Sequence, residues 1–250
     1  MIQTESDIIN AVRAFRAKRG YTVAPLRACL FDMDGVLIDS MPAHARSWVE
    51  ASAAYGITAE PLYFYRCEGQ KGSDTIERLF LQVHGRRATA QETDDYYQLK
   101  TELFSRYNTG NAITDAPALV ADVRANGLHI VLVTGSSQND ILDRLQVHYG
   151  DAFGSANVIT GTDVIRGKPH PEPYLKALER ANVAPWEAIV IENAPMGVRA
   201  AVAAGIFTLA VTTGCLPDAD LWAAGASVIF PSMANLRSAL PALLAESGSR

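Results

Sequence analysis

The chain has 250 residues, with 22 lysines and arginines against 27 aspartates and glutamates, which gives a formal net charge of −5. This acidic balance argues against a surface for nucleic acid or anionic membrane, because both need a positive field. Apolar residues make up 48%, typical of a globular protein, and no apolar run approaches the roughly 20 residues of a membrane span. Because the three cysteines are widely spaced and no signal segment is evident, we expect a cytoplasmic protein.

The first predicted element is a helical extension, residues 1–24, in front of the main fold. A helix from Ser6 to Lys18, capped by one of its first residues, would place Ile8 and Val12 on one apolar face. Gly20 would end it. We expect this helix to lie against the body of the protein.

Five short apolar runs have the profile of buried parallel strands. Helical segments that begin near a proline and end near glycine or asparagine separate most of these runs. Strands that alternate with helices predict an α/β fold with a mainly parallel, Rossmann-like sheet. The runs are Ala28–Phe31, His129–Val133, Asn157–Ile159, Ala188–Ile191 and Ile206–Val211.

The interval 41–110 interrupts this alternation. It contains no convincing buried strand and predicts three helices, the last of them opened by a capping box of Thr89 and Glu92. A helical block inserted after the first strand is typical of a cap domain. We therefore expect a helical cap at 41–110 and an α/β core formed by 25–40 and 111–250.

Two carboxylates follow the first strand. Asp32 and Asp34 come directly after the apolar run, and Gly35 lets the chain turn sharply behind them. Ligands of open α/β sheets bind at this carboxyl edge. Two carboxylates so close repel each other unless a cation lies between them or one is protonated, and either arrangement suits catalysis. Alone, the pattern would also fit a solvated acidic turn.

Three later segments bring complementary groups to the same edge of the sheet. The first offers hydroxyl and backbone donors to a phosphate, the second offers a cation, and the third offers oxygen ligands for a metal. Each alone could be a helix cap or a solvated charge, whereas together they supply what phosphate chemistry needs. The segments are Thr134-Gly135-Ser136, Lys168-Pro169 and Glu192-Asn193.

This ordered set of motifs resembles the haloacid dehalogenase superfamily over nearly the whole chain, from Ala28 to Met233. The inserted helical block is similar to the cap of the β-phosphoglucomutase-like branch. The resemblance implies that Asp32 attacks phosphorus and becomes an aspartyl-phosphate. It also implies that Asp34 protonates the leaving oxygen and then deprotonates water.

The resemblance further implies a Mg²⁺ site and a phosphate-binding site. Mg²⁺ would be held by Asp32, the backbone carbonyl of Asp34 and an oxygen of the pair Glu192 and Asn193. Most members of the family carry aspartate where this chain has Asn193, so metal affinity should fall unless Glu192 contributes more directly. The residues expected to bind the phosphoryl group are Thr134, Gly135, Ser136 and Lys168.

The cap loop at 66–74 corresponds to the specificity loop of this family. The sugar-phosphate mutase pattern has a lysine before its glycine and an arginine four residues later, where this chain has Glu68 and Gly72. An acidic Glu68 would repel a second phosphate, which favours a hydrolase in which Glu68 orders metal-bound water or excludes larger phospho-sugars. Lys71 could still meet an anionic oxygen. Alternatively, Glu68 simply faces solvent.

The sequence therefore predicts a Mg²⁺-dependent phosphohydrolase for a small phosphorylated metabolite or inorganic pyrophosphate, with no nucleic-acid or membrane partner. His44, on the first cap helix, would orient Asp34 when the cap closes, or else is structural. β-Phosphoglucomutase is the alternative enzyme, and a haloacid dehalogenase fits less well because halide displacement does not need Asp34. A non-catalytic phosphorylation switch is more distant, because receiver domains carry no inserted cap. The sequence leaves the oligomeric state open.

Overall fold

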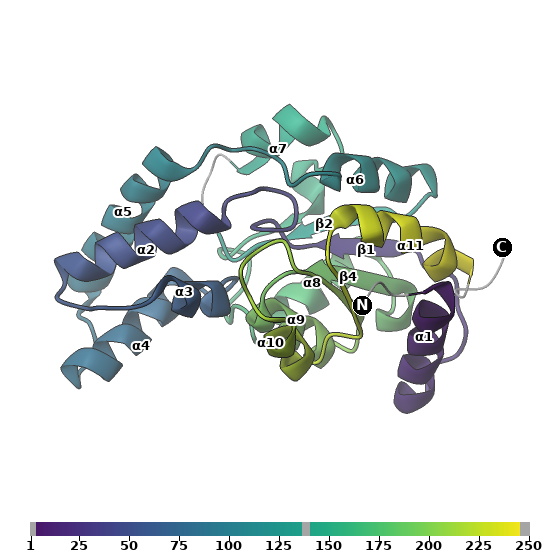
Figure 1. Ribbon diagram of the computed structural model, residues 1–250, viewed down its shortest axis with the longest axis horizontal. Helices are drawn as coiled ribbons and strands as arrows, with labels where there is room; N and C mark the ends of the chain where they lie inside the picture. The colour runs from purple at the N-terminus through teal and green to yellow at the C-terminus, as the bar shows by residue number, and fades with distance from the viewer. Residues whose placement is uncertain (1–3, 137–140, 246–250) are drawn as a thin grey trace.

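The structure is a computed structural model that describes residues 4–136 and 141–245 (Figure 1). Within these residues, six strands form one sheet in the order β3-β2-β1-β4-β5-β6, and every neighbouring pair is parallel. This confirms the predicted α/β fold with a parallel sheet. The strands are β1 (Ala28–Phe31), β2 (His129–Val133), β3 (Val158–Ile159), β4 (Ala188–Glu192), β5 (Phe207–Val211) and β6 (Val228–Phe230).

Each of the five predicted apolar runs contains a strand, and the sequence did not predict β6. With three residues, Val228–Phe230 is too short for its apolar run to stand out between the neighbouring helices. It is recognised only from its pairing with β5 at the end of the sheet.

Helices cover both faces of the sheet (Figure 1). Along β1, Cys29 and Phe31 pack toward one face and Ala28 and Leu30 toward the other, as the alternation of a strand requires. Helices α1, α6, α7 and α11 contribute to the first face, and α8 and α9 to the second, with α10 beside α9. Their bounds are α1 (Glu5–Arg19), α6 (Ala116–Ala125), α7 (Ile141–Tyr149), α8 (Glu172–Ala181), α9 (Pro195–Ala203), α10 (Asp218–Ala224) and α11 (Met233–Ala245).

Helix α1 begins slightly earlier than predicted. Thr4, and not a residue within the predicted helix, is the cap: its hydroxyl accepts from the backbone of Asp7, whose carboxylate accepts from the backbone of Thr4. Gly20 ends the helix in the left-handed conformation. Ile8 and Val12 are buried in the same core cluster as the residues of α11, beside which α1 lies in Figure 1.

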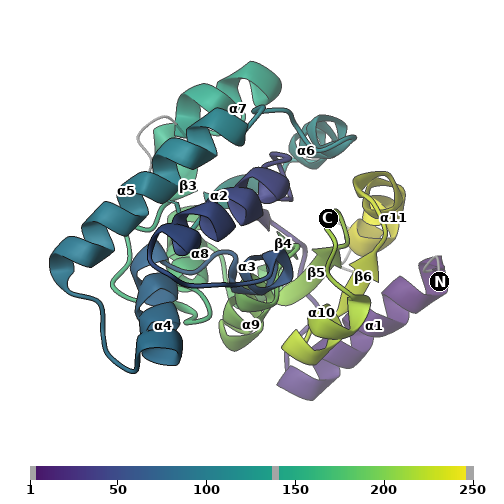
Figure 2. The same ribbon diagram turned by 60° about the vertical axis from the view of Figure 1, so that its left-hand side comes forward.

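Four helices, which we call the cap, pack together to one side of the sheet (Figure 2). They are α2 (Met41–Ala54), α3 (Pro61–Cys67), α4 (Gly72–His84) and α5 (Ala90–Tyr107). They share an apolar cluster that includes Trp48, Phe64 and Phe80. The predicted capping box of Thr89 and Glu92 opens α5. None of the helices within the described residues combines the length and apolar composition of a membrane span.

Candidate active site

Asp32 lies directly after β1, at the carboxyl edge of the sheet, and contacts Lys168. The Lys168 ammonium donates to Asp32 Oδ1 at 2.5 Å and to the carbonyl of Val133, at the end of β2, at 3.0 Å. Asp32 is 3% exposed and Lys168 is 1% exposed. The lysine thus joins the ends of two neighbouring strands, and its charge is directed at the predicted nucleophile.

The two buried charges perturb each other. Burial, followed by the negative charge of Glu192, raises the pKa of Asp32 well above its ordinary value, against the opposing effect of Lys168. Burial alone would lower the pKa of Lys168, but the carboxylates of Asp32 and Glu192 outweigh it and raise that pKa. Lys168 therefore stays positively charged beside Asp32.

Glu192, the last residue of β4, is held by protein donors on both of its oxygens. Oε1 accepts from Lys168 at 2.6 Å and from the hydroxyl of Tyr174 at 2.7 Å, and Oε2 accepts from the backbone N–H of Asn193 at 3.1 Å. A Cβ at Gly197 would lie 1.7 Å from Oε1, so only glycine leaves room for this carboxylate. The Glu192 side chain is therefore engaged in fixing Lys168.

Asn193 supplies an oxygen that no described residue satisfies. Its Oδ1 is buried and lacks a hydrogen-bond partner, while its amide nitrogen lies against Gly35, where a Cβ would come within 1.9 Å. An unsatisfied buried acceptor destabilises a protein by about 1–3 kcal/mol. Together with the carboxylate of Asp32 and the backbone carbonyl of Asp34, this oxygen makes a set of hard ligands that fits Mg²⁺.

Asp34 belongs to a buried chain of hydrogen bonds that reaches into the cap. Its Oδ1 accepts from the Ser40 hydroxyl at 2.5 Å and lies 3.2 Å from His44 Nε2. The other ring nitrogen, Nδ1, lies 2.9 Å from the ammonium of Lys100. Because an ammonium can only donate, Nδ1 accepts and Nε2 carries the proton that points at Asp34. His44 on α2 therefore connects Asp34 with Lys100 on α5.

The sequence does not single out Lys100, which is 3% exposed. A signal exists, because Tyr96, Lys100 and Leu103 share one face of the predicted helix, and a lysine within an apolar stripe needs a buried partner. Its partner, His44, lies 56 residues away in the chain. The sequence alone could not identify that pairing.

The loop between α3 and α4 carries Glu68 over the site. Asp34, His44 and Glu68 each offer an oxygen or nitrogen atom within 4.8 Å of the others. Both ring nitrogens of His44 are engaged by Asp34 and Lys100, so this cluster suits proton handling better than metal ligation. The cavity here is lined by both cap and core, with Glu68 and Lys100 on the cap side and Asp34 and Ser136 on the core side.

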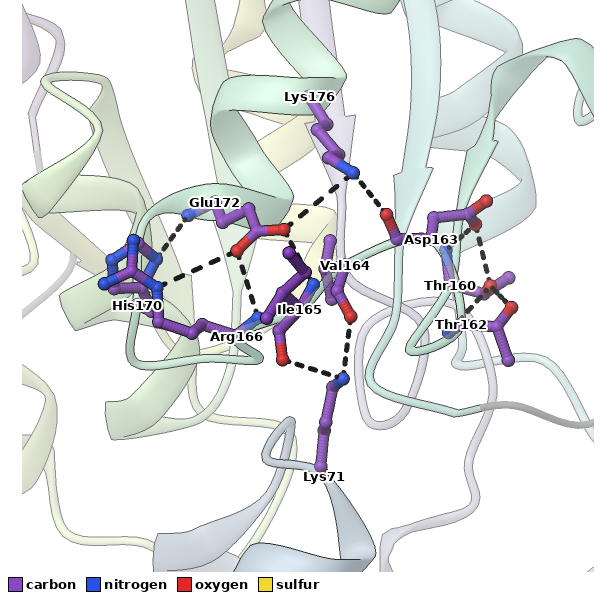
Figure 3. A network of polar contacts seen from close by, with 10 residues as sticks. All are labelled: Lys71, Thr160, Thr162, Asp163, Val164, Ile165, Arg166, His170, Glu172 and Lys176. Atoms are coloured by element: carbon purple, nitrogen blue, oxygen red, sulfur yellow. Dashed lines mark hydrogen bonds and ion pairs between the residues drawn. The ribbon is translucent and has the colours of Figure 1, made fainter.

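Lys71 lies farther along the same loop and contacts the core. Its ammonium donates to the carbonyls of Val164 and Ile165 at 2.7 and 3.0 Å (Figure 3). The carboxylate of Glu172 accepts from the backbone N–H groups of Ile165 and Arg166 at 2.7 and 3.0 Å. These bonds fix the loop that precedes Lys168. The predicted contact of Lys71 with a substrate anion stays a prediction.

The predicted phosphate-binding segment also lies beneath the cap loop. Thr134 is buried, and its hydroxyl accepts from the backbone N–H of Ser136 at 3.1 Å. A Cβ at Gly135 would lie 2.6 Å from the carbonyl oxygen of Gly69. Cap and core are therefore in direct backbone contact beside the site.

Comparisons with known proteins agree with this geometry. Residues 26–205 match the family model of haloacid dehalogenase-like hydrolases. The chain is 29% identical to hexitol phosphatase A of Escherichia coli over 182 residues, which cover 73% of this chain and 81% of the relative. It is 30% identical to phosphoglycolate phosphatase of Yersinia pseudotuberculosis, with 76% and 82% covered.

One solved structure is similar to this chain over nearly the full length of both proteins. It is that of a Bacteroides vulgatus protein that bears the provisional name of a β-phosphoglucomutase. The TM-score is 0.94 and the identity 39%, over 98% of this chain and 100% of the other.

Proposed function

The chain belongs to the haloacid dehalogenase-like hydrolases, and on that premise we propose that it is a Mg²⁺-dependent phosphohydrolase of small phosphorylated substrates, inorganic pyrophosphate among them. The observation that carries this proposal is the contact between the buried carboxylate of Asp32 and the ammonium of Lys168 at the strand ends. The phosphatase activities named for the relatives support the reaction class. A cytoplasmic location stays a prediction.

In the first step, an oxygen of Asp32 attacks phosphorus, the bond to the leaving oxygen breaks, and an aspartyl-phosphate forms. Lys168 offsets negative charge on both the nucleophile and the phosphoryl group. Thr134 and the backbone of Gly135 and Ser136 are proposed to bind phosphoryl oxygens. Phosphoryl transfer depends mainly on such positioning and charge stabilisation.

Asp34 handles the proton in both steps. In the first it protonates the leaving oxygen, and in the second it takes a proton from the water that attacks the aspartyl-phosphate. Ser40 and His44 fix its Oδ1, so the carboxyl group keeps one orientation. Lys100 sets the tautomer of His44 and thereby the donor that faces Asp34.

We propose that Mg²⁺ is held by Asp32, the backbone carbonyl of Asp34 and Oδ1 of Asn193. When bound, the ion supplies positive charge that neutralises phosphoryl oxygens. The unpartnered oxygen of Asn193 supports this assignment. Because its carboxylate already accepts from Lys168 and Tyr174, Glu192 is proposed to act through Lys168 and not as a ligand.

The proposal is tested by measuring phosphate release with Mg²⁺ from pyrophosphate, phosphoglycolate, hexitol phosphates and glucose 1-phosphate. Asp32→Asn should abolish all turnover, because an amide is a poor nucleophile. Asp39→Asn is the matched control, since Asp39 is an exposed carboxylate seven positions later. Full activity of Asp32→Asn would refute the mechanism.

β-Phosphoglucomutase is the second candidate, favoured by the name of the similar Bacteroides vulgatus protein. Glu68 opposes it, because the second phosphate of a sugar bisphosphate needs positive charge and Glu68 brings a carboxylate to the site. Conversion of glucose 1-phosphate to glucose 6-phosphate with negligible phosphate release would establish the mutase instead.

A further inference from the structure

Lys71 reaches from the cap loop onto two consecutive peptide groups of the core (Figure 3). Its ammonium donates to the carbonyls of Val164 and Ile165 at 2.7 and 3.0 Å. Its side chain also lies on Gly167, where a Cβ would come within 3.0 Å of Cγ of the lysine. The cap is therefore docked next to Lys168, which contacts the predicted nucleophile.

The same two peptide groups are bound from their other ends by Glu172, the first residue of α8. Its Oε1 accepts from the backbone N–H of Ile165 at 2.7 Å, and its Oε2 accepts from that of Arg166 at 3.0 Å. The first peptide group joins Val164 to Ile165, and the second joins Ile165 to Arg166. Each therefore lies between the positive charge of Lys71 at its oxygen and the negative charge of Glu172 at its nitrogen.

This arrangement strengthens both hydrogen bonds of each peptide group. A peptide group that donates to an anion is polarised, so its carbonyl oxygen becomes a better acceptor, and hydrogen bonds to charged groups are about twice as strong as neutral ones. The two backbone donors, that of Ile165 first, lower the pKa of Glu172, so its carboxylate is charged at neutral pH. Glu172 thus prepares the carbonyls that Lys71 binds.

Polar contacts hold this docking site in place, because the side chains of the loop give it little apolar packing. Ile165 is 86% exposed, and Arg166 is exposed as well. The ammonium of Lys176 and the guanidinium of Arg166 lie farther from the carboxylate of Glu172 than its two backbone donors, at 3.8 and 3.9 Å. The direction of the two carbonyls therefore depends on Glu172.

We propose that Glu172 is a positioning residue that orients and polarises the carbonyls on which Lys71 docks, and so stabilises the closed cap. The inference rests on the proposed function, because the cap loop to which Lys71 belongs carries Glu68 over the site. The role of Glu172 in docking requires Lys71, whereas its role in fixing the loop before Lys168 does not.

The experiment is a double-mutant cycle of Glu172→Gln and Lys71→Met, read by the hydrogen-exchange rate of residues 66–74 and by KM for pyrophosphate. Glu172→Gln keeps the shape of the side chain and removes its charge. With Lys71 present, it should raise both quantities by about three- to fivefold. In the Lys71→Met background it should change neither by more than about 1.5-fold, because the docked ammonium is gone.

A merely structural role of Glu172 predicts a different result. It would raise the exchange rate and KM by the same factor whether or not Lys71 is present, and such independent effects would overturn the proposal. Any loss of kcat that comes from a loosened loop before Lys168 should be the same in both backgrounds, so kcat and KM separate the two roles.

Glu187→Gln is the matched control. The Glu187 side chain is 19% exposed, against 18% for Glu172, and its Oε2 also accepts from a backbone N–H, that of Ala184 at 2.8 Å. Glu187 directly precedes β4, at the opposite edge of the sheet from the site. Its substitution should therefore leave the exchange rate of the cap loop and KM at wild-type values.

The two proposals fail in different ways. If the wild type releases no phosphate from any substrate, the proposed function fails, and hydrogen exchange still tests the role of Glu172. If the wild type is active but the two substitutions act independently, only the role of Glu172 is refuted. Should Glu172→Gln not fold, as judged by its thermal unfolding curve, Glu172→Asp shortens the reach to the two N–H groups, and independent effects there would equally overturn the proposal.

Discussion

Replacing Tyr174 with phenylalanine would remove one hydroxyl from the centre of the site while keeping the ring. The hydroxyl donates to Oε1 of Glu192 at 2.7 Å, and the residue is fully buried. A hydrogen bond to a charged group contributes about 1.5–3 kcal/mol, and Glu192 keeps Lys168 as a second donor. We therefore expect Tyr174→Phe to lower the free energy of unfolding by about 1.5–3 kcal/mol, which lowers Tm by roughly 3–12 °C in a chain of this length.

The matched control is Tyr149→Phe. The Tyr149 hydroxyl donates to the neutral carbonyl of Leu37 at 2.6 Å, and that carbonyl keeps the backbone N–H of Ile113 as a second donor. A neutral bond contributes about 0.5–1.5 kcal/mol, so the control should unfold at a higher temperature than Tyr174→Phe. Thermal and urea unfolding measure both. Equal losses in the two variants would refute the argument that the charge of Glu192 strengthens its bond to Tyr174.

Three further outcomes follow from the structure. Lys71→Met should raise KM severalfold at unchanged Tm, because it removes two hydrogen bonds between the cap and the core and none within the cap or within the core. Steady-state kinetics measure the change in KM, and thermal unfolding curves measure Tm. Asn193→Asp should tighten Mg²⁺ binding by about tenfold or more in a calorimetric titration, because it adds a negative charge beside the ion. The pKa of Glu92 is lowered to about 2 from its ordinary 4.5, by Arg86 first, so its contribution to stability is complete above about pH 4.5 and lost as pH falls through about 2. The stability difference between the wild type and Glu92→Gln should therefore shrink between about pH 6 and about pH 3.

The parts of the site that the sequence predicts share one property. Asp32, Thr134 and Asn193 each follow closely on a buried apolar run, and the ends of parallel strands meet at one edge of the sheet. The positions of the apolar runs are therefore enough to predict that these three residues lie close together. Lys168 could be assigned to the site as well, because its loop lies just before a helix whose start is predicted from a proline.

The parts that the sequence does not predict depend on how helices pack. Lys100 lies on α5 and Tyr174 lies on α8, each within an apolar helical stripe that looks like ordinary core. Their polar atoms acquire a role only from partners far away in the chain, such as His44 for Lys100. The direction of Lys71 likewise depends on how the cap sits against the core, which local patterns do not encode.

A substitution at Gly135 tests whether activity needs the close contact between the cap loop and the core. Alanine there would put a Cβ 2.6 Å from the carbonyl oxygen of Gly69 and 2.9 Å from its carbon, and because these are backbone atoms, only a shift of the whole loop relieves the clash. The cap loop with Glu68 must then retreat from the site, so kcat/KM should fall by about tenfold or more, since a misplacement near 1 Å can reduce rates a hundredfold.

Gly154→Ala is the matched control for Gly135→Ala. Its Cβ would meet nothing within 4 Å, and its φ of −81° suits any residue, so activity and Tm should stay at wild-type values. Gly135 likewise has no positive φ, so Gly135→Ala introduces no backbone strain and its Tm should change little. A loss of activity without a loss of Tm would therefore place the effect at the contact between cap and core. Wild-type activity in Gly135→Ala would show that the reacting enzyme does not need this contact.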